Sequence, residues 1–388
     1  MTPPCENGIP FPVLPQSPIL DAVRNVAAIR PATPFILVNQ LILNRNLDRL
    51  ATYASDHGLN VRPHAKTHKS LEIARWQLER GAIGLTVAKP GEGEVLADAC
   101  SDLLLAYPVI EPLKAVRVAA LASSNDVKVA VDSPESLCVL SAAAAKIGAT
   151  ISILIDLDVG LHRTGVQSPG AAVRLAECAD RLPNLLMRGI FCYPGHIWSP
   201  VDCQQMPLSV VSDLLQETID LFTRRGTSID IVSGGSTPTA YQSHFVPQLT
   251  EIRPGTYLFN DINTVSGGYA SLDDCAAVIV ATVVSNAISG QIVIDAGSKT
   301  LAADRCVTHP DSGYGRVVEY PAARITKLSE EHGQIDVSLC AVPPKIGERI
   351  AIIPNHICPC INLQDSVWLE TSVGELVAMS VDARGKVT

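Results

Sequence analysis

The chain has 388 residues, of which 47% are hydrophobic, and it carries a formal net charge of −9 with a pI near 5.5. This length suits a large barrel domain, or a barrel with a smaller partner domain. The acidic balance, with lysine and arginine scattered along the chain, argues against a nucleic-acid partner. No apolar run approaches the roughly 20 residues that span a bilayer, so we expect no membrane partner either.

Residues 1–16 are rich in proline and lack a charged stretch followed by an apolar one, so they do not predict a secretory signal. The 11 cysteines are dispersed over predicted helices and strands, which is typical of free thiols in a reducing compartment. Both observations predict a cytoplasmic protein.

From residue 59 to residue 261, short apolar runs alternate with amphipathic stretches at a repeat of roughly 25 residues. The sequence predicts strands at 60–66, 83–88, 103–107, 127–132, 151–158, 187–193, 229–233 and 251–259. Helical patterns separate most of them, and strands that alternate with helices run parallel. Eight such units predict an α/β fold with a closed (β/α)8 TIM barrel rather than an open doubly wound sheet.

After about residue 269 the pattern changes to short strands with frequent turns, at 276–284, 291–295, 325–328, 349–353, 366–370 and 376–381. No comparable helices separate them, so we predict a second, mainly β domain. The early strand 33–39 precedes the barrel and is expected to join that domain. The predicted domains are a barrel at 40–268 and a β domain formed by 1–39 plus 269–388.

A lysine framed by two histidines, Lys66, lies in the run R-P-H-A-K-T-H-K at 62–69, where the first barrel strand ends. A lysine at the mouth of a strand, among cationic neighbours that favour its uncharged amine, is suited to form a Schiff base with an aldehyde cofactor. Pyridoxal phosphate is the obvious aldehyde. In such a barrel the chemistry lies at the carboxyl ends of the strands, where Arg163, Tyr193 and His196 also fall.

Two loops at neighbouring strand ends are suited to hold a phosphate. The turn S-G-G-S-T at 233–237 offers glycine amides and hydroxyls, although taken alone it also fits a flexible turn. The loop R-P-G-T-Y at 253–257 follows one strand later and could add an amide from Gly255 and the phenol of Tyr257. Barrels of this class often hold phosphate beside their last two strands.

The fifth barrel strand ends in D-x-G-x-x-R-x-G at 158–165, which places Arg163 between glycines. An arginine near a pyridine nitrogen would keep that nitrogen unprotonated, and one near a phenolate oxygen would stabilise its charge. A surface ion pair with Asp156 or Asp158 is the alternative.

Near the end of the chain, the segment N-H-I-C-P-C at 355–360 places His356 two residues before Cys358. In an extended strand these positions face the same side, so both side chains could bind one ion. Imidazole and thiolate ligands favour zinc over magnesium, and two protein ligands leave positions open for water and substrate. A buried histidine beside two core cysteines is the alternative.

Together and in this order, the motifs resemble the D-threonine aldolase and D-serine dehydratase family, pyridoxal phosphate enzymes of the alanine-racemase-like fold. The resemblance covers nearly the whole chain. It is carried by R-P-H-A-K-T-H-K at 62–69, D-x-G-x-x-R-x-G-V at 158–166, Tyr193 with His196, S-G-G-S-T-P-T at 233–239 and P-N-H-I-C-P at 354–359.

The resemblance implies that Lys66 holds the cofactor and is the base at the substrate's Cα, and that His356 and Cys358 complete the catalytic residues. These two would hold a divalent ion beside the substrate; zinc is the expected ion, and manganese and magnesium are the alternatives. A homodimer is expected, because active sites in the family lie where one subunit's β domain meets the other's barrel. The residues expected to bind the cofactor are Lys66, Arg163, Tyr193, His196, Gly234, Gly235, Ser236, Thr237, Gly255 and Tyr257, the last six at its phosphate.

Two lyase reactions on small D-3-hydroxy amino acids then compete. A dehydratase eliminates water and yields a 2-oxo acid and ammonia, whereas an aldolase breaks the Cα–Cβ bond and yields glycine and an aldehyde. Cys358 favours the dehydratase, because the aldolase branch usually carries aspartate there. The following Pro359, Asn362, Leu363 and Asp365 look more like the aldolase segment.

Two other classes stay open. A racemase needs a second catalytic acid from the β domain, for which Tyr314 or Tyr320 could serve, but a metal pair would then have no task. A non-catalytic protein that binds pyridoxal phosphate would be a single barrel, and the predicted β domain at residues 270–388 argues against this class. The substrate's side chain is not identified, so D-serine, D-threonine and 3-hydroxy-D-aspartate all remain.

Overall fold

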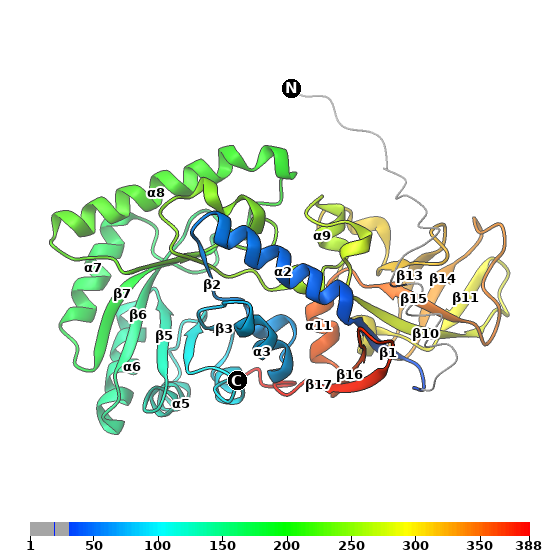
Figure 1. Cartoon of the computed structure of the whole chain (residues 1–388), viewed down its shortest axis with the longest axis horizontal. Coiled ribbons are helices and arrows are strands. Elements are labelled where there is room, and N and C mark those ends of the chain that lie inside the picture. The colour runs from blue at the N-terminus through cyan, green and yellow to red at the C-terminus, as the bar shows by residue number, and fades with distance from the viewer. Residues whose placement is uncertain (1–18, 20–30) are drawn as a thin grey trace.

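The computed structural model describes residue 19 and residues 31–388, and two sheets dominate it (Figure 1). One sheet has the strand order β2-β9-β8-β7-β6-β5-β4-β3, and the other has the order β11-β14-β13-β12-β15-β10-β1-β16-β17. The predictions for residues 1–16, and most of the predicted 1–39 part of the β domain, lie outside the described residues.

The first sheet contains the eight parallel strands that the sequence predicts. The chain leaves the first and the last of them earlier than predicted, because it turns into the short 3-10 helices η1 (Ala65–Thr67) and η4 (Thr256–Leu258). The strands are β2 (Asn60–Val61), β3 (Leu85–Val87), β4 (Asp102–Leu105), β5 (Asp126–Val131), β6 (Ile151–Leu157), β7 (Leu185–Cys192), β8 (Ile231–Gly234) and β9 (Glu251–Ile252).

This sheet closes on itself. A parallel bridge joins His64, which follows β2, to Thr86, which lies in β3. Strands β2 and β3 are the two ends of the strand order. The amide of Thr86 also donates to the carbonyl of Pro63 over 2.9 Å, and that of Ile83 to Val61 over 2.9 Å. The predicted closed (β/α)8 barrel is therefore confirmed.

Helices follow most barrel strands and lie outside the sheet (Figure 1). Proline stands at the start of four of them, α4 to α7, where its missing N–H has no helical partner to lose. The helices are α2 (Gln40–Asp56), α3 (Leu71–Glu79), α4 (Pro90–Leu96), α5 (Pro112–Ala122), α6 (Pro134–Ile147), α7 (Pro169–Asp180) and α8 (Gln205–Arg224), with η2 (Val201–Cys203) and η3 (Ala240–Phe245). No helix among the described residues is both long and apolar enough to cross a membrane.

The second sheet forms the mainly β part. The early strand β1 (Phe35–Asn39), which the sequence predicts to join this part, lies inside the sheet, antiparallel to β10 and parallel to β16. The other strands are β10 (Ala277–Ser285), β11 (Gln291–Ile294), β12 (Arg316–Val317), β13 (Arg324–Leu328), β14 (Gly333–Asp336), β15 (Arg349–Ile353), β16 (Ser366–Glu370) and β17 (Leu376–Ser380). Short helices between them are α9 (Ile262–Ser266), η5 (Leu272–Asp274), α10 (Ser298–Leu301), η6 (Pro310–Ser312) and α11 (Ile357–Asn362). The domain limits at residues 40 and 268 stay a prediction.

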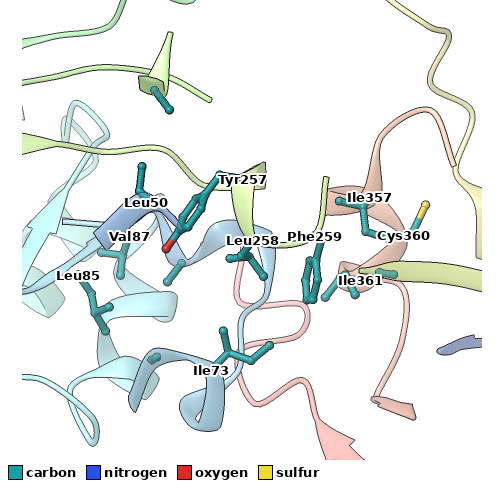
Figure 2. Packing of buried hydrophobic residues seen from close by; sticks show 14 of the residues in the cluster. Leu50, Ile73, Leu85, Val87, Tyr257, Leu258, Phe259, Ile357, Cys360 and Ile361 are labelled. Atoms are coloured by element: carbon teal, nitrogen blue, oxygen red, sulfur yellow. The ribbon is translucent and has the colours of Figure 1, made fainter. Parts of the chain in front are cut away.

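One apolar core runs from the barrel into the β part (Figure 2). Leu258 and Phe259 are less than 2% exposed and follow the last barrel strand. On one side of them lie Leu50, Ile73, Leu85 and Val87, and on the other lie Ile357, Cys360 and Ile361 of α11. This packing holds α11 against the carboxyl ends of the barrel strands, where the predicted site residues lie.

Candidate active site

A cleft at the carboxyl ends of the barrel strands contains two cavities that share His64, Lys66, Tyr193 and Arg253. Lys66 is therefore central to the cleft. The first cavity, of about 180 Å³, is also lined by Trp198, Ser236, Thr237, Pro238, Gly255, Thr256, Asp261, Asn263, Thr264, Val307 and His356. The second cavity, of about 310 Å³, continues to Ala88, Lys89, Ala106, Tyr107, Pro108, Arg163, Thr164 and Phe191.

Lys66 lies in η1, the turn that follows β2. The Nδ1 atom of His64 caps this turn by accepting a hydrogen bond from the Lys66 amide over 3.5 Å. Burial, together with the charges of Lys66 and Arg253, lowers the pKa of His64 well below its ordinary value. Burial also lowers the pKa of His68 to about 4. Both histidines are thus neutral at neutral pH and are not the cationic neighbours that we expected for Lys66. Arg253 is a cation that lines both cavities with it.

Arg253 lies on the floor of the cleft and is a residue that the sequence analysis missed. Its Nη1 donates to Ser233 Oγ over 2.6 Å, and its Nη2 donates to the carbonyl of Cys192 over 2.6 Å. The guanidinium carbon lies 3.8 Å from the centroid of the Phe191 ring. Burial lowers the pKa of Arg253 to about 10, which leaves it charged at neutral pH. The motif R-P-G-T-Y, considered only for its amide and phenol, begins with this arginine.

The two loops predicted to hold phosphate meet at one end of the first cavity. Thr237 Oγ1 accepts hydrogen bonds from the amides of Gly255 over 3.2 Å and Thr256 over 3.0 Å. A Cβ atom on Gly255 would lie 2.7 Å from Thr67 Oγ1, so glycine lets this loop approach the lysine turn. The hydroxyls of Ser236 and Thr237 line the cavity and are donors that fit a phosphate, and the amides of Gly255 and Thr256, bound here to Thr237 Oγ1, lie beside them.

Gly234 and Gly235 shape this loop from behind and do not line the cavity. A Cβ atom on Gly234 would lie 2.5 Å from Leu249 Cδ2. Gly235 has a φ of +78°, a conformation that favours glycine. Only the backbone of Gly234 and Gly235 could contact the phosphate, and this contact stays a prediction.

Tyr257 lies beside Leu50 in the apolar core (Figure 2) and lines neither cavity of the cleft. Its hydroxyl accepts a hydrogen bond from Gln77 Nε2 over 3.1 Å, and its ring lies near Leu50 and Val61. The helical turn η4 points Thr256 into the first cavity and the next side chain to the opposite side. The prediction that the Tyr257 phenol binds phosphate is therefore wrong.

His196 is exposed and lines neither cavity, against our prediction. The chain turns after β7, where the Gly195 amide donates to the Tyr193 carbonyl over 2.9 Å. This turn carries the His196 ring onto Gly160, whose Cβ position lies 2.9 Å from the ring atoms. Only Tyr193 of this predicted pair reaches the cleft.

Arg163 and Tyr193 meet at the wall of the second cavity. The guanidinium carbon lies 4.9 Å from the centroid of the tyrosine ring. The alternative ion pair with Asp156 or Asp158 does not form, because Asp156 accepts from the Thr164 hydroxyl and Asp158 binds within its own loop. Arg163 is thus directed at the cleft, as predicted.

Asp158 fixes the loop that carries Arg163. Its Oδ1 accepts hydrogen bonds from the amides of Gly160 and His162, each over 3.0 Å. Burial opposes the charged carboxylate, but these hydrogen bonds outweigh burial and lower the pKa of Asp158 to about 2.

We expect Asp158→Asn to lower the free energy of unfolding by roughly 2 kcal/mol at neutral pH. The pKa of Asp158 in the folded protein lies below its ordinary value of 3.8. The ionised carboxylate therefore stabilises the fold fully at pH values above 3.8, and this stabilisation is lost as the pH falls toward 2. Urea unfolding at neutral pH and near pH 3 checks this. If the difference in free energy of unfolding between the unmodified protein and Asp158→Asn does not shrink at the lower pH, the prediction is contradicted. Asp365→Asn, in an exposed pair with Arg384, is the control and should change stability by less than about 1 kcal/mol.

His356 and Cys358 lie at the start of α11 and not in the extended strand that we predicted. His356 is the N-cap, and Cys358 belongs to the first helical turn. The helix begins here because the buried carboxylate of Asp261 accepts a hydrogen bond from the Ile357 amide over 3.1 Å. The two side chains nevertheless lie close enough that each shifts the pKa of the other.

The Cys358 sulfur lies close to the lysine turn, where Sγ is 3.3 Å from Thr67 Oγ1. Burial raises the pKa of this thiol, but the charges of His356 and Lys66 outweigh burial and lower it. Burial lowers the pKa of His356, but the neighbouring Cys358 and Asp304 outweigh burial and raise it. The pair therefore favours a thiolate, which is the form of cysteine that binds metals.

The donor set of this pair fits a zinc-type ion. Asp304 Oδ2 lies 2.9 Å from His356 Nδ1, and a carboxylate in this place orients the imidazole so that Nε2 can face a metal. Within the described part of the chain no group of three or more histidine, cysteine, aspartate or glutamate side chains could hold a metal. Two protein ligands would thus leave positions for water or substrate. The roles of Asp304 and Asp261 beside His356 could not be predicted from the sequence, because both residues lie far from it along the chain.

Two family models match this chain. Residues 38–262 match the alanine racemase N-terminal domain, and residues 276–369 match a putative serine dehydratase domain. The chain belongs to this alanine-racemase-like family.

Known members of the family are similar over most of their length. The 3-hydroxy-D-aspartate aldolase of Paracoccus denitrificans (strain Pd 1222) is 30% identical over 373 residues, which are 91% of this chain and 92% of that protein. The D-serine dehydratase of Dictyostelium discoideum is 30% identical over 362 residues, which are 84% of this chain and 90% of that protein. The crystal structure of D-threonine aldolase from Filomicrobium marinum has a TM-score of 0.85 at 30% identity, covering 92% of this chain and 97% of its own. The predicted D-threonine aldolase and D-serine dehydratase family is confirmed.

Proposed function

We propose that this protein is a pyridoxal-phosphate-dependent lyase that eliminates water from D-3-hydroxy amino acids. The carrying observation is the contact of 3.3 Å between Cys358 Sγ and Thr67 Oγ1, because it sets the candidate metal ligands beside Lys66. The similarity to lyases that act on D-hydroxy amino acids supports the reaction class.

The residues of the cleft fit the cofactor by their chemistry. Lys66 would hold its aldehyde, the loops with Ser236, Thr237 and Gly255 its phosphate, and Arg163 with Tyr193 would line its ring. When bound, pyridoxal phosphate withdraws electrons from the substrate's Cα and weakens the bonds at that atom. With the substrate bound, the Lys66 amine would be the base that takes the Cα proton.

His356 and Cys358 would hold a divalent ion, and we propose zinc. The ion would supply Lewis acidity toward the β-hydroxyl or a carboxylate of the substrate. Asp304 keeps the His356 ring oriented, and Thr67 holds the Cys358 sulfur near Lys66. Loss of the Cα proton and of the β-hydroxyl as hydroxide leaves an enamine, which water converts into a 2-oxo acid and ammonia.

Retro-aldol cleavage is the second candidate, and the similarity to aldolases favours it. In that reaction the β-hydroxyl proton is removed and the Cα–Cβ bond breaks. The racemase alternative is weaker, because a metal pair beside Lys66 would then have no task, and the Tyr320 hydroxyl already binds Glu348.

Product analysis tests the proposal. The protein loaded with cofactor and zinc is incubated with D-threonine, and glycine and 2-oxobutanoate are measured in the same sample. We expect 2-oxobutanoate with ammonia, whereas glycine with acetaldehyde would make the protein an aldolase. D-Serine and 3-hydroxy-D-aspartate are assayed in parallel, and no product from any of them would overturn the lyase proposal.

We also propose that the enzyme is a cytoplasmic homodimer that needs no nucleic acid or membrane. The family resemblance supports the dimer, and the acidic charge speaks against nucleic acid. Sedimentation of the loaded protein tests the dimer, which a monomer at assay concentration would contradict.

A further inference from the structure

The motif at 62–69 ends in a second lysine, Lys69, which lines neither cavity of the cleft. Its Nζ lies 2.7 Å from Glu92 Oε1, and the two side chains are only 5% and 2% exposed. A buried ion pair often adds no stability over an apolar pair of similar volume. Stability alone therefore does not account for this pair.

Lys69 also closes the turn that carries Lys66. Its amide donates to the carbonyl of Ala65 over 2.8 Å, so that one hydrogen bond spans Lys66. The φ of Lys69 is +52°, in the left-handed region that residues with a Cβ atom rarely adopt. A strained residue of this kind persists only where its surroundings fix it. The contacts that fix Lys69 therefore also fix the turn of Lys66.

Glu92 joins Lys69 to the wall of the second cavity. Glu92 belongs to α4, and its Oε2 accepts a hydrogen bond from the Ala88 amide over 2.6 Å. Ala88 lines the second cavity together with Lys66. The ion pair therefore connects the lysine turn to the loop that follows β3, directly beside the cleft.

The segment that follows β17 holds the other side of Lys69. The Ala383 amide donates to the Lys69 carbonyl over 2.9 Å, and Lys69 Nζ donates to the Ala383 carbonyl over 3.4 Å. The neighbouring Asp382 accepts a hydrogen bond from the Leu71 amide over 2.8 Å at the start of α3, where the Ser70 side chain does not cap the helix. The β part therefore anchors the lysine turn from a segment far along the chain.

We propose that Lys69 is a positioning residue, which holds the lysine turn so that the Lys66 amine faces the aldehyde of the cofactor. Its ammonium is fixed by Glu92 and Ala383, and its backbone is bound to Ala65. Because Lys69 lines neither cavity, it acts through Lys66 and not on the substrate. This inference rests on the proposed function, which takes Lys66 as the residue that holds the cofactor.

The test follows the bond that Lys66 forms with added cofactor. Saturating pyridoxal phosphate is mixed with the whole chain freed of cofactor. The absorption band near the visible edge reports the condensation of the Lys66 amine with the aldehyde, which releases water. Lys69→Met should slow this step at least about tenfold, because displacement of a reacting group by about 1 Å can cost about 10²-fold in rate. The affinity for pyridoxamine phosphate, which has the ring and the phosphate but no aldehyde, should change by no more than a few-fold.

A second variant separates positioning from stability. Lys69→Met leaves the buried charge of Glu92 without its cation and should lower the urea midpoint, which Lys69→Met/Glu92→Gln should largely restore. The rate of bond formation should stay low in this double variant.

Lys128→Met is the matched control. Lys128 is an equally buried lysine, 5% exposed, that pairs with Asp102 and Asp126. These two carboxylates are the first residues of β4 and β5, at the end of the barrel away from the cleft. Lys128→Met should lower stability and leave the rate of bond formation unchanged.

A rate in Lys69→Met close to that of the unmodified protein would overturn the positioning role, as would a rate that recovers together with stability in the double variant. A fall in pyridoxamine phosphate affinity as large as the fall in rate would also overturn it, because Lys69 would then shape the whole cleft. If Lys69→Met does not fold, the double variant decides alone. If the unmodified protein forms no band, the proposed function fails, and the positioning role fails with it.

Discussion

Replacement of Lys66 by methionine is expected to reduce turnover by at least about 10³-fold, because the chain loses both the group that holds the cofactor and the base at Cα. Methionine keeps the length of the side chain and removes only the amine. The first readout is the rate of 2-oxo acid or glycine formation. The second is the absorption band of the bound cofactor near the visible edge, which borohydride should fix onto Lys66 in the unmodified protein.

Lys299→Met is the control for this substitution, since Lys299 lies in an exposed pair with Glu331 away from both cavities. It should keep the absorption band and the turnover. Circular dichroism of Lys66→Met should match that of the unmodified protein, which separates loss of chemistry from loss of folding. Reduction that labels a different lysine, or turnover that survives in Lys66→Met, would sink the assignment.

Periodicity was enough to predict the barrel, because parallel strands buried on both faces are continuous apolar runs that amphipathic helices separate. Strand β6 illustrates this, since its residues 151–157 are almost entirely buried. Strands β12 and β14 were not predicted. They contain only two and four residues, too few for an alternating pattern to be recognised against a loop.

Site residues could be predicted where the barrel brings the ends of its strands together. They could not be predicted where a local turn decides which way a side chain points. Lys66 and Thr237 line one cavity because each follows a barrel strand, β2 and β8, and only β9 lies between these two strands in the sheet. Tyr257 follows the same rule by position, yet the turn η4 directs its phenol into the core. The pair at 356 and 358 was predicted as strand neighbours, whereas the start of α11 depends on Asp261, 96 residues earlier.

Loss of the Cys358 sulfur is expected to have the second-largest effect. Because replacing even an outer-shell partner of a metal typically costs 10–100-fold in affinity, Cys358→Ala should weaken zinc binding by at least about 100-fold. The fall follows from the missing thiolate, which the charges of His356 and Lys66 favour in the intact protein. Competition with a chelator measures zinc affinity, and the cofactor's absorption band should persist because the phosphate loops are unchanged.

Cys360→Ala is the matched control for this prediction. The Cys360 thiol is also buried in α11, but it donates to the carbonyl of Leu301 over 3.2 Å and does not reach Thr67. Its loss should therefore leave zinc affinity within a few-fold of the unmodified protein, whereas Cys358→Ala should not. Chelation of the unmodified enzyme should reproduce the loss of turnover, and re-addition of zinc should restore it. Full turnover in metal-free protein would instead mean that the thiolate beside Lys66 acts without an ion, and the hydroxide would then have to leave by proton transfer from a side chain of the cleft.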